Sequence, residues 1–157
     1  MAEGLVGHVS ATAGRTGEVH TVQKNPIGTR AFGLSGNEYI YLAGVASTIV
    51  GSVVTYDEAG VTTLIAVNAK GPVAVATAIT VASTWGWYCI YGTIPVDVVA
   101  NSADNSTVGR ETTDGKVGDG RAAGDQIANF FQRAATTTAA VVNCQIMYPF
   151  VDDFMGA

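Results

Sequence analysis

The stretch TWGWYCIYG, residues 84–92, combines two tryptophans and two tyrosines with no charged residue. Side chains on a β-strand alternate between two faces. On a strand, one face of this stretch holds its largest side chains and a cysteine: Trp85, Trp87, Cys89 and Tyr91. The other face holds Tyr88 and Ile90 with two glycines. Because both faces are apolar or aromatic, we predict a strand that protein covers on both sides, with the second cover supplied by this chain or by another subunit.

Strand patterns flank this stretch on both sides. EYIYLAGVAST begins at Glu38, and we expect its strand to end near Gly44. TIVGSVVTY and VTTLIAV are separated by four polar or small residues, 57–60, which is typical of a β-hairpin. VAVATAITVA, residues 73–82, alternates β-branched residues with alanine and predicts a strand with one core face and one flat face. AAVVNCQIMYPFV, residues 139–151, predicts a strand that Pro149 ends.

Two regions have less regular patterns. Residues 100–125 are polar and rich in turn-forming residues, and a weak hairpin is compatible with them. Asp125 is a possible helix cap, and helical spacing relates four residues after it, Ile127, Phe130, Phe131 and Ala134. The same residues fit a strand equally well. Both interpretations therefore remain open for residues 125–135.

Residues 1–37 are rich in glycine and threonine and have no sustained period. We predict an extended N-terminal arm over residues 1–37, with one short strand near residues 19–23; a frayed terminus is the alternative. Residues 38–157 then form a single β-rich domain. Seven or eight short strands without a βαβ rhythm predict an all-β, mainly antiparallel fold. We expect a compact β-sandwich or barrel with at most one short helix.

Charged residues are only 13 % of the chain, and the formal net charge is −5. Lysine and arginine are scattered singly, so we expect no nucleic-acid partner, which would require a clustered basic surface. Residues 71–96 are uncharged and long enough to span a bilayer, but they contain two prolines and alternate with period two. We therefore expect no membrane segment, and the N-terminal residues do not resemble a secretory signal. The low charge favours an oligomer.

The chain shows no recognisable catalytic or metal-binding motif. Cys89 and Cys144 lie in apolar strand patterns, and we expect buried thiols, with a disulfide as the alternative. The histidines, His8 and His20, are distant from both cysteines in sequence, so zinc-ligand spacing is absent. We predict a protein that is not an enzyme and uses no cofactor or metal. A calcium site remains an alternative at three acids among glycines, Asp114, Asp119 and Asp125.

The aromatic strands offer the best candidates for contacts with other proteins. Aromatic residues are enriched in protein interfaces. The sequence shows no set of catalytic residues that would instead indicate an active site. The residues predicted to form the contact surface come from three strand patterns: Trp85, Trp87, Tyr88, Tyr91, Tyr39, Tyr41 and Phe150. If the same rings were exposed they could instead stack on sugars. The alternative function is therefore a carbohydrate-binding β-sandwich module on a virion or cell surface.

Several segments, taken in order, resemble the head decoration (cement) proteins of tailed bacteriophages. They span roughly residues 38–153 and are EYIYLAGVAST, GSVVTYDEAGVTTLI, GPVAVATAI, WGWYCIYG, GDGRAAGDQI and QIMYPFVDD. The resemblance implies a structural protein on the capsid surface of the virion. Its expected partners are the major capsid protein, whose assembled lattice it would bind and stabilise, and itself, as a homotrimer. It implies no catalytic residue and no cofactor.

Overall fold

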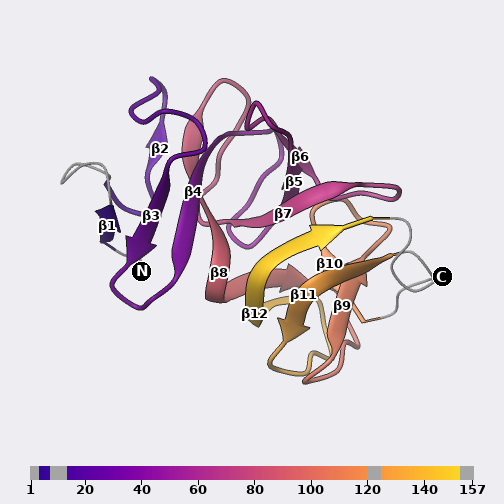
Figure 1. Cartoon of the computed structure of the whole chain (residues 1–157). Helices are drawn as coiled ribbons and strands as arrows, with labels where there is room; N and C mark the ends of the chain where they lie inside the picture. Colours follow the sequence, from indigo (N-terminus) through magenta and orange to yellow (C-terminus); the bar gives the residue numbers. More distant parts are fainter. Residues whose placement is uncertain (1–3, 8–13, 120–124, 153–157) are drawn as a thin grey trace.

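The fold is organised around one long strand, β8 (Trp85–Val98), in a computed structural model that describes residues 4–7, 14–119 and 125–152. The first half of β8 pairs antiparallel with β4 (Glu38–Ala43) on one side and with β7 (Gly71–Ala76) on the other. Its second half pairs antiparallel with β12 (Ala140–Val151). The same strand therefore belongs to two neighbouring parts of the molecule (Figure 1).

The described residues form one sheet of twelve strands and contain no helix. The remaining strands are β1 (Leu5–Gly7), β2 (Val19–His20), β3 (Arg30–Gly33), β5 (Val53–Tyr56), β6 (Thr62–Leu64), β9 (Thr107–Arg110), β10 (Val117–Gly118) and β11 (Gln126–Gln132). All the pairings are antiparallel except the one between β8 and β10. The predicted all-β, mainly antiparallel fold is confirmed.

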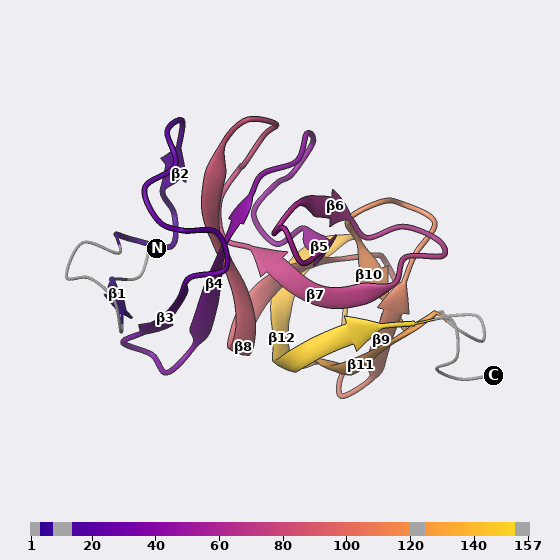
Figure 2. The same ribbon diagram turned by 45° about the horizontal axis from the view of Figure 1, so that its top comes forward.

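Part of this sheet closes on itself. Strand β8 pairs with β10, and the pairing continues through β9, β11 and β12 back to β8. We call these strands the ring. Figure 2 shows the ring on one side of the first half of β8 and strands β4, β3 and β1 on the other. The fold is thus a partial barrel whose sheet continues beyond the ring in both directions.

Two hydrophobic clusters cover the two faces of β8. Trp87 and Cys89 belong to the larger cluster, which also fills the ring with residues such as Phe130 and Ile146. Tyr88 and Ile90 belong to the smaller cluster. All of these side chains are at most 1 % exposed. The prediction of a strand covered on both sides is confirmed, and both covers come from this chain.

A sharp bend at Gly92 allows β8 to serve both parts. Gly92 has a φ of 113°, a backbone conformation that residues with a side chain rarely adopt. The side chain of Asn37 holds the bend, because its amide nitrogen donates to the Thr93 carbonyl at 2.9 Å and its oxygen accepts from the Thr93 N–H at 3.1 Å. A Cβ atom at Gly92 would overlap the Asn37 side-chain oxygen. The absence of a side chain at Gly92 therefore leaves the space that the Asn37 side chain needs to bind Thr93.

Three short strands in the segment predicted to be an arm pair with the sheet. Strand β3 pairs with β4, and β2 pairs with β8 at the site predicted for a short strand. Ala31 and His20 are buried, so the chain is folded against the sheet well before residue 38. The short strand predicted near residues 19–23 is confirmed as β2, whereas strands of three or four residues such as β3 are too short to show a period in the sequence. Residues 1–3 and 8–13 lie outside the described residues.

The strand predicted over residues 73–82 ends at Ala76. The hydroxyl of Thr77 donates to the Trp87 carbonyl at 2.6 Å, and side-chain bonds of this kind compete with strand pairing. Ile79 and Val81 lie after the strand and are 62 % and 45 % exposed, so they do not extend the core face. The other predicted face is buried: Ala74 and Ala76 lie in the smaller cluster, where their small size permits close packing.

Three C-terminal expectations are also resolved. Residues 126–132 form strand β11, so the helical alternative is wrong, and the weak hairpin exists as β9 and β10. Pro149 does not end β12, which continues to Val151. The strand instead bends at Tyr148, which has a φ of 50°. Beyond the bend it pairs with Gly71 and Pro72 of β7.

Replacing Gly92 by alanine should destabilise the fold by about 3 kcal/mol, because the substitution adds both backbone strain and overlap with Asn37. Gly36→Ala is the matched control, since Gly36 also has a positive φ of 88° but has no atom within 4 Å of the position that a Cβ would occupy. Its cost should be about 1–2 kcal/mol. Urea unfolding followed by tryptophan fluorescence measures both values. Equal losses would contradict the role assigned to the Gly92–Asn37 contact.

Candidate docking surface

Five large apolar side chains lie exposed on three strands of the sheet. We call them the aromatic patch: Phe32 on β3, Tyr91 on β8, and Met147, Tyr148 and Phe150 on β12. Each is between 38 % and 50 % exposed. The strand register connects them, because Phe32 pairs with Glu38, Glu38 with Tyr91, and Tyr91 with Met147. Residues directly opposite each other on paired strands share a face, so Phe32, Tyr91 and Met147 lie on one surface. The Tyr148 ring joins them through its contact with Tyr91, and Phe150 follows two residues later as the next exposed residue of β12.

The bend in β12 enlarges this surface. Before the bend, buried residues Cys144 and Ile146 alternate with outward-facing ones. At Tyr148 the alternation changes phase, so that Met147 and Tyr148 are both exposed and Pro149 is buried. This positive-φ bulge therefore directs two consecutive large side chains to the same outer face.

Tyr148 is held in place by its neighbours. Its hydroxyl donates to one oxygen of Glu38, while an Arg30 nitrogen binds the other oxygen at 3.1 Å. The Tyr91 ring lies 5.4 Å from the Tyr148 ring, centre to centre, and the Arg30 guanidinium carbon lies 5.7 Å from the centre of the same ring. Glu38 is only 4 % exposed, whereas the Tyr148 ring is 49 % exposed. A buried carboxylate thus holds the hydroxyl of an exposed ring.

Two tyrosines near Glu38 have raised pKa values, for different reasons. The hydrogen bond to the Glu38 carboxylate raises the pKa of Tyr148 above its ordinary value, because losing the proton would break that bond and place two anions together. Burial raises the pKa of Tyr56, with smaller and opposed effects from Arg30 and Glu38. Tyr56 therefore lies within electrostatic reach of the same ion pair.

The structure separates the seven residues predicted for the contact surface. Four rings lie inside this chain with at most 2 % exposure: Tyr39, Tyr41, Trp87 and Tyr88. Because intramolecular packing covers them, they are removed from the proposed surface. Trp85 is partly buried against the larger cluster. Tyr91 and Phe150 lie on the aromatic patch.

Other residues of the surface were missed in the sequence. Arg30 and Phe32 fell in the segment predicted to be an arm, and Glu38 was treated only as the start of a strand. Tyr148 was part of a predicted strand, but no sequence signal shows that a bulge would turn it outward beside Met147. The available clue was the proline of QIMYPF, which interrupts an otherwise regular strand pattern.

Buried Tyr41 links His20 of the N-terminal segment to Trp87 in the core. The Nδ1 atom of His20 lies 2.7 Å from the Tyr41 hydroxyl, and its Nε2 atom lies 3.4 Å from Glu18. Tyr41 in turn packs edge-on against Trp87, with ring centres 5.1 Å apart. Burial raises the pKa of Tyr41. These contacts connect the N-terminal segment to the core and explain why these rings are unavailable to a partner.

Within the described residues, no group of three histidine, cysteine or acidic side chains is placed to hold a metal. Of the acids considered for calcium, Asp125 pairs with Arg110, and Asp119 accepts from the Ala103 N–H at 2.7 Å. Asp114 lies exposed on a turn. Burial, together with Asp119 and Asp125, raises the pKa of Glu111. Asp119 and Asp125 therefore have structural partners within this chain.

Both cysteine thiols are buried and no disulfide joins them, as the favoured interpretation of the sequence predicted. Burial raises the pKa of Cys144 to about 12. Since the thiolate is the reactive form of cysteine, Cys144 is poorly suited to nucleophilic chemistry at neutral pH. In the part of the chain that the structure describes, no helix has the length and apolar character needed to cross a membrane.

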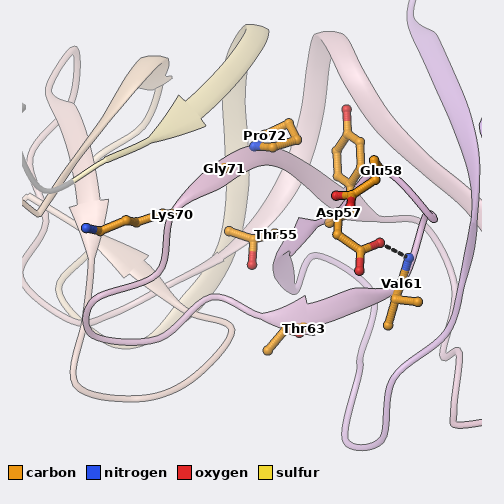
Figure 3. A pocket seen from close by; sticks show the side chains of 9 residues that line it. Thr55, Asp57, Glu58, Val61, Thr63, Lys70, Gly71 and Pro72 are labelled. Atoms are coloured by element: carbon orange, nitrogen blue, oxygen red, sulfur yellow. Dashed lines mark hydrogen bonds between the residues drawn. The ribbon is translucent and has the colours of Figure 1, made fainter.

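A shallow depression lies at the β5–β6 hairpin, near one edge of the aromatic patch. We call it the hairpin hollow, and its volume is about 620 Å³. Its walls come from the hairpin and from the start of β7 (Figure 3): Thr55, Tyr56, Asp57, Glu58, Val61, Thr63, Lys70, Gly71 and Pro72. Phe150 of the patch pairs with Pro72 of the hollow. The two features are therefore adjacent.

The fold and this surface define an all-β protein of the partial-barrel type with an exposed aromatic face. No protein-family model matches the chain, and neither curated proteins nor solved structures give a match.

Tyr148→Phe should lower the free energy of unfolding by about 1 kcal/mol at neutral pH, since it removes the hydrogen bond to Glu38 at a solvent-open position. Because the pKa of Tyr148 is raised in the folded state, the bond contributes fully below the ordinary tyrosine pKa of 10.0. The contribution is lost as the pH rises through the folded-state pKa. Urea unfolding of both proteins at a series of alkaline pH values measures the difference.

Tyr91→Phe is the control, because it alters the neighbouring ring without removing the hydroxyl bound to Glu38. The wild type and Tyr148→Phe share every other tyrosine, so the contribution of those residues cancels between these two proteins. A stability difference between the wild type and Tyr148→Phe that did not change above pH 10 would contradict this assignment.

Proposed function

We propose that this chain is a structural virion protein that decorates an assembled capsid by docking on its major capsid protein and stabilising the shell. The observation that carries the proposal is the aromatic patch. Contiguous apolar surface of this kind is uncommon on lone soluble proteins and is typical of sites that bind other proteins. Its composition of tyrosine, phenylalanine, methionine and a flanking arginine is the one enriched in protein interfaces.

The rigid support of Tyr148 also favours a docking role. Glu38, Arg30 and Tyr91 hold the ring before any partner arrives. Less side-chain freedom is then lost on binding, so more of the contact energy contributes to affinity. Tyrosine and arginine are also over-represented among the few residues that dominate binding energy. Tyr148 is therefore the residue on which we expect attachment to depend most.

The resemblance to phage head decoration proteins supports the same proposal. Patch residues lie within the segments that resemble the family: Tyr91 in WGWYCIYG, and Met147, Tyr148 and Phe150 in QIMYPFVDD. Glu38, which supports Tyr148, begins EYIYLAGVAST. Residues that pack the core and residues that face outward are thus both part of the resemblance.

The resemblance also motivates the remaining parts of the proposal. We propose that the protein acts on the virion surface without enzymatic activity and associates as a homotrimer. The low share of charged residues favours an assembled state. Sedimentation velocity of the purified chain tests the trimer: a single species at the trimer mass is expected, and a strict monomer at all concentrations would contradict it.

The carbohydrate-binding alternative is also limited to this surface, because Trp87 and Tyr88 are buried. Tyr91 and Tyr148 are exposed, but their rings are only 5.4 Å apart and tilted by 36°. They contact each other and offer one small stacking platform, not a row that follows a sugar chain. The geometry favours a protein partner.

Tyr148→Ala should weaken binding to empty capsid shells of the encoding phage by about 30-fold or more, as expected for a central interface residue worth about 2 kcal/mol. Co-sedimentation of purified protein with the shells measures the dissociation constant. Val141→Ala is the matched control, because Val141 is 51 % exposed on the same strand but lies outside the patch. It should bind like the wild type.

Two outcomes would reject the proposal. The first is that the wild-type chain fails to associate with the shells under any ionic condition. The second is that Tyr148→Ala and Val141→Ala bind as well as the wild type. Quenching of tryptophan fluorescence by a panel of oligosaccharides, lost in Tyr148→Ala, would instead support the carbohydrate-binding alternative.

A further inference from the structure

The pairing of β11 with β12 is interrupted beside the aromatic patch. Asn129 of β11 alone lies opposite three residues of β12, 147–149, because the residues on either side keep their pairing across the interruption. Asn129 has a φ of 59°, and Tyr148 on the facing strand has a φ of 50°. Each strand therefore has one residue with left-handed backbone at the same point of the ladder.

The core requires a change of phase in both strands at this point. Ile127 pairs with Val151 and Phe130 pairs with Ile146, and all four side chains belong to the larger cluster. The two residues of β11 are three positions apart, and the two of β12 are five positions apart. In a regular strand an odd separation puts side chains on opposite faces. Both pairs can face the core only because each strand shifts its alternation once.

The two changes of phase depend on each other. If β11 kept a regular alternation through Asn129, Ile127 would leave the core, and Val151 would lose its core partner. In a β12 without its own shift, Met147 and Tyr148 would face opposite sides of the sheet. The two exposed side chains of the patch therefore share a face only while both strands are shifted.

Asparagine suits the position in β11. It adopts left-handed backbone more readily than most residues with a side chain, whereas bulky residues such as tyrosine rarely do so. The shift in β12 is thus the less favourable of the two, and the contacts of Tyr148 with Glu38 and Tyr91 hold it. Asn129 supplies the matching shift at a lower cost.

We propose that Asn129 is the positioning residue of the aromatic patch, because its left-handed backbone allows β12 to turn Met147 and Tyr148 to the same outer face. The effect on attachment rests on the proposed function, whereas the effect on the orientation of Tyr148 does not. Asn129 acts through its backbone, so glycine can replace it and a β-branched residue cannot.

Alkaline titration of Tyr148 tests the orientation without any partner. The tyrosinate absorbance of each variant, minus that of the same variant carrying Tyr148→Phe, isolates this residue. In the wild type and in Asn129→Gly, the pKa of Tyr148 should stay above the ordinary value of 10.0, because the Glu38 carboxylate holds its proton. In Asn129→Val the pKa should fall towards that value, because a ring that turns away loses this bond.

Asn101→Val is the matched control, since Asn101 is also exposed with a φ of 59° but lies outside β11 and β12. It should lower the urea midpoint about as much as Asn129→Val does and leave the titration of Tyr148 unchanged. If Asn129→Val does not fold, Asn129→Ala with Asn101→Ala provides the same comparison. Alanine also disfavours left-handed backbone but adds less bulk.

Binding to empty capsid shells tests the effect on attachment. Asn129→Val should weaken binding by about tenfold or more, and Asn129→Gly should bind within about twofold of the wild type. Equal losses in both variants, with the titration of Tyr148 unchanged in Asn129→Gly, would assign the effect to the asparagine side chain and overturn the positioning role.

The titration separates this inference from the proposed function. A folded Asn129→Val or Asn129→Ala in which Tyr148 titrates as in the wild type overturns the inference and leaves the proposed function standing. An equal shift in the Asn101 control also overturns it. If the titrations follow the expectation but the wild type does not bind shells, the proposed function is overturned, and Asn129 still orients Tyr148.

Discussion

The bend of β8 at Gly92, held by Asn37, is the constraint on which the rest of the structure depends. Before the bend the strand lies between β4 and β7, and after it the strand belongs to the ring. Without the change of direction one strand could not connect both parts. The positive φ strongly favours glycine. Asn37 and the Thr93 backbone exchange two hydrogen bonds, one donated by each residue, while Thr93 stays in register with β12 on its other side. Local backbone geometry thus determines the architecture.

The same principle operates at the proposed docking surface. In β12, the bend at Tyr148 lets the strand leave β8 and join β7, and it also brings Met147 and Tyr148 to one face. Glu38, buried at the start of β4, then binds the hydroxyl of Tyr148 and the guanidinium of Arg30. A buried carboxylate needs such partners, because an unpaired charge with little access to water is costly. Stability and a rigid outer surface therefore come from the same contacts.

The fold combines a densely packed core with an exposed aromatic face. Its largest rings, Trp87, Tyr39 and Tyr41, are buried in the chain itself. Residues from three strands that are distant in sequence meet on the outer surface, next to the hairpin hollow. In the proposed role, the aromatic patch would supply most of the affinity.

By itself, the sequence determined that the protein is all-β, that the strand containing Trp87 is covered on both sides, and that the hairpin at residues 57–60 forms. These features depend on side-chain alternation and turn residues within a few positions of each other, which are visible in a single segment. Only the tertiary structure decided that Tyr39, Tyr41, Trp87 and Tyr88 face the core while Tyr148 faces solvent. It also decided that Arg30 and Glu38 meet beneath Tyr148. The physical reason is that register shifts and strand partners determine which face is covered, and these are properties of pairings between distant segments.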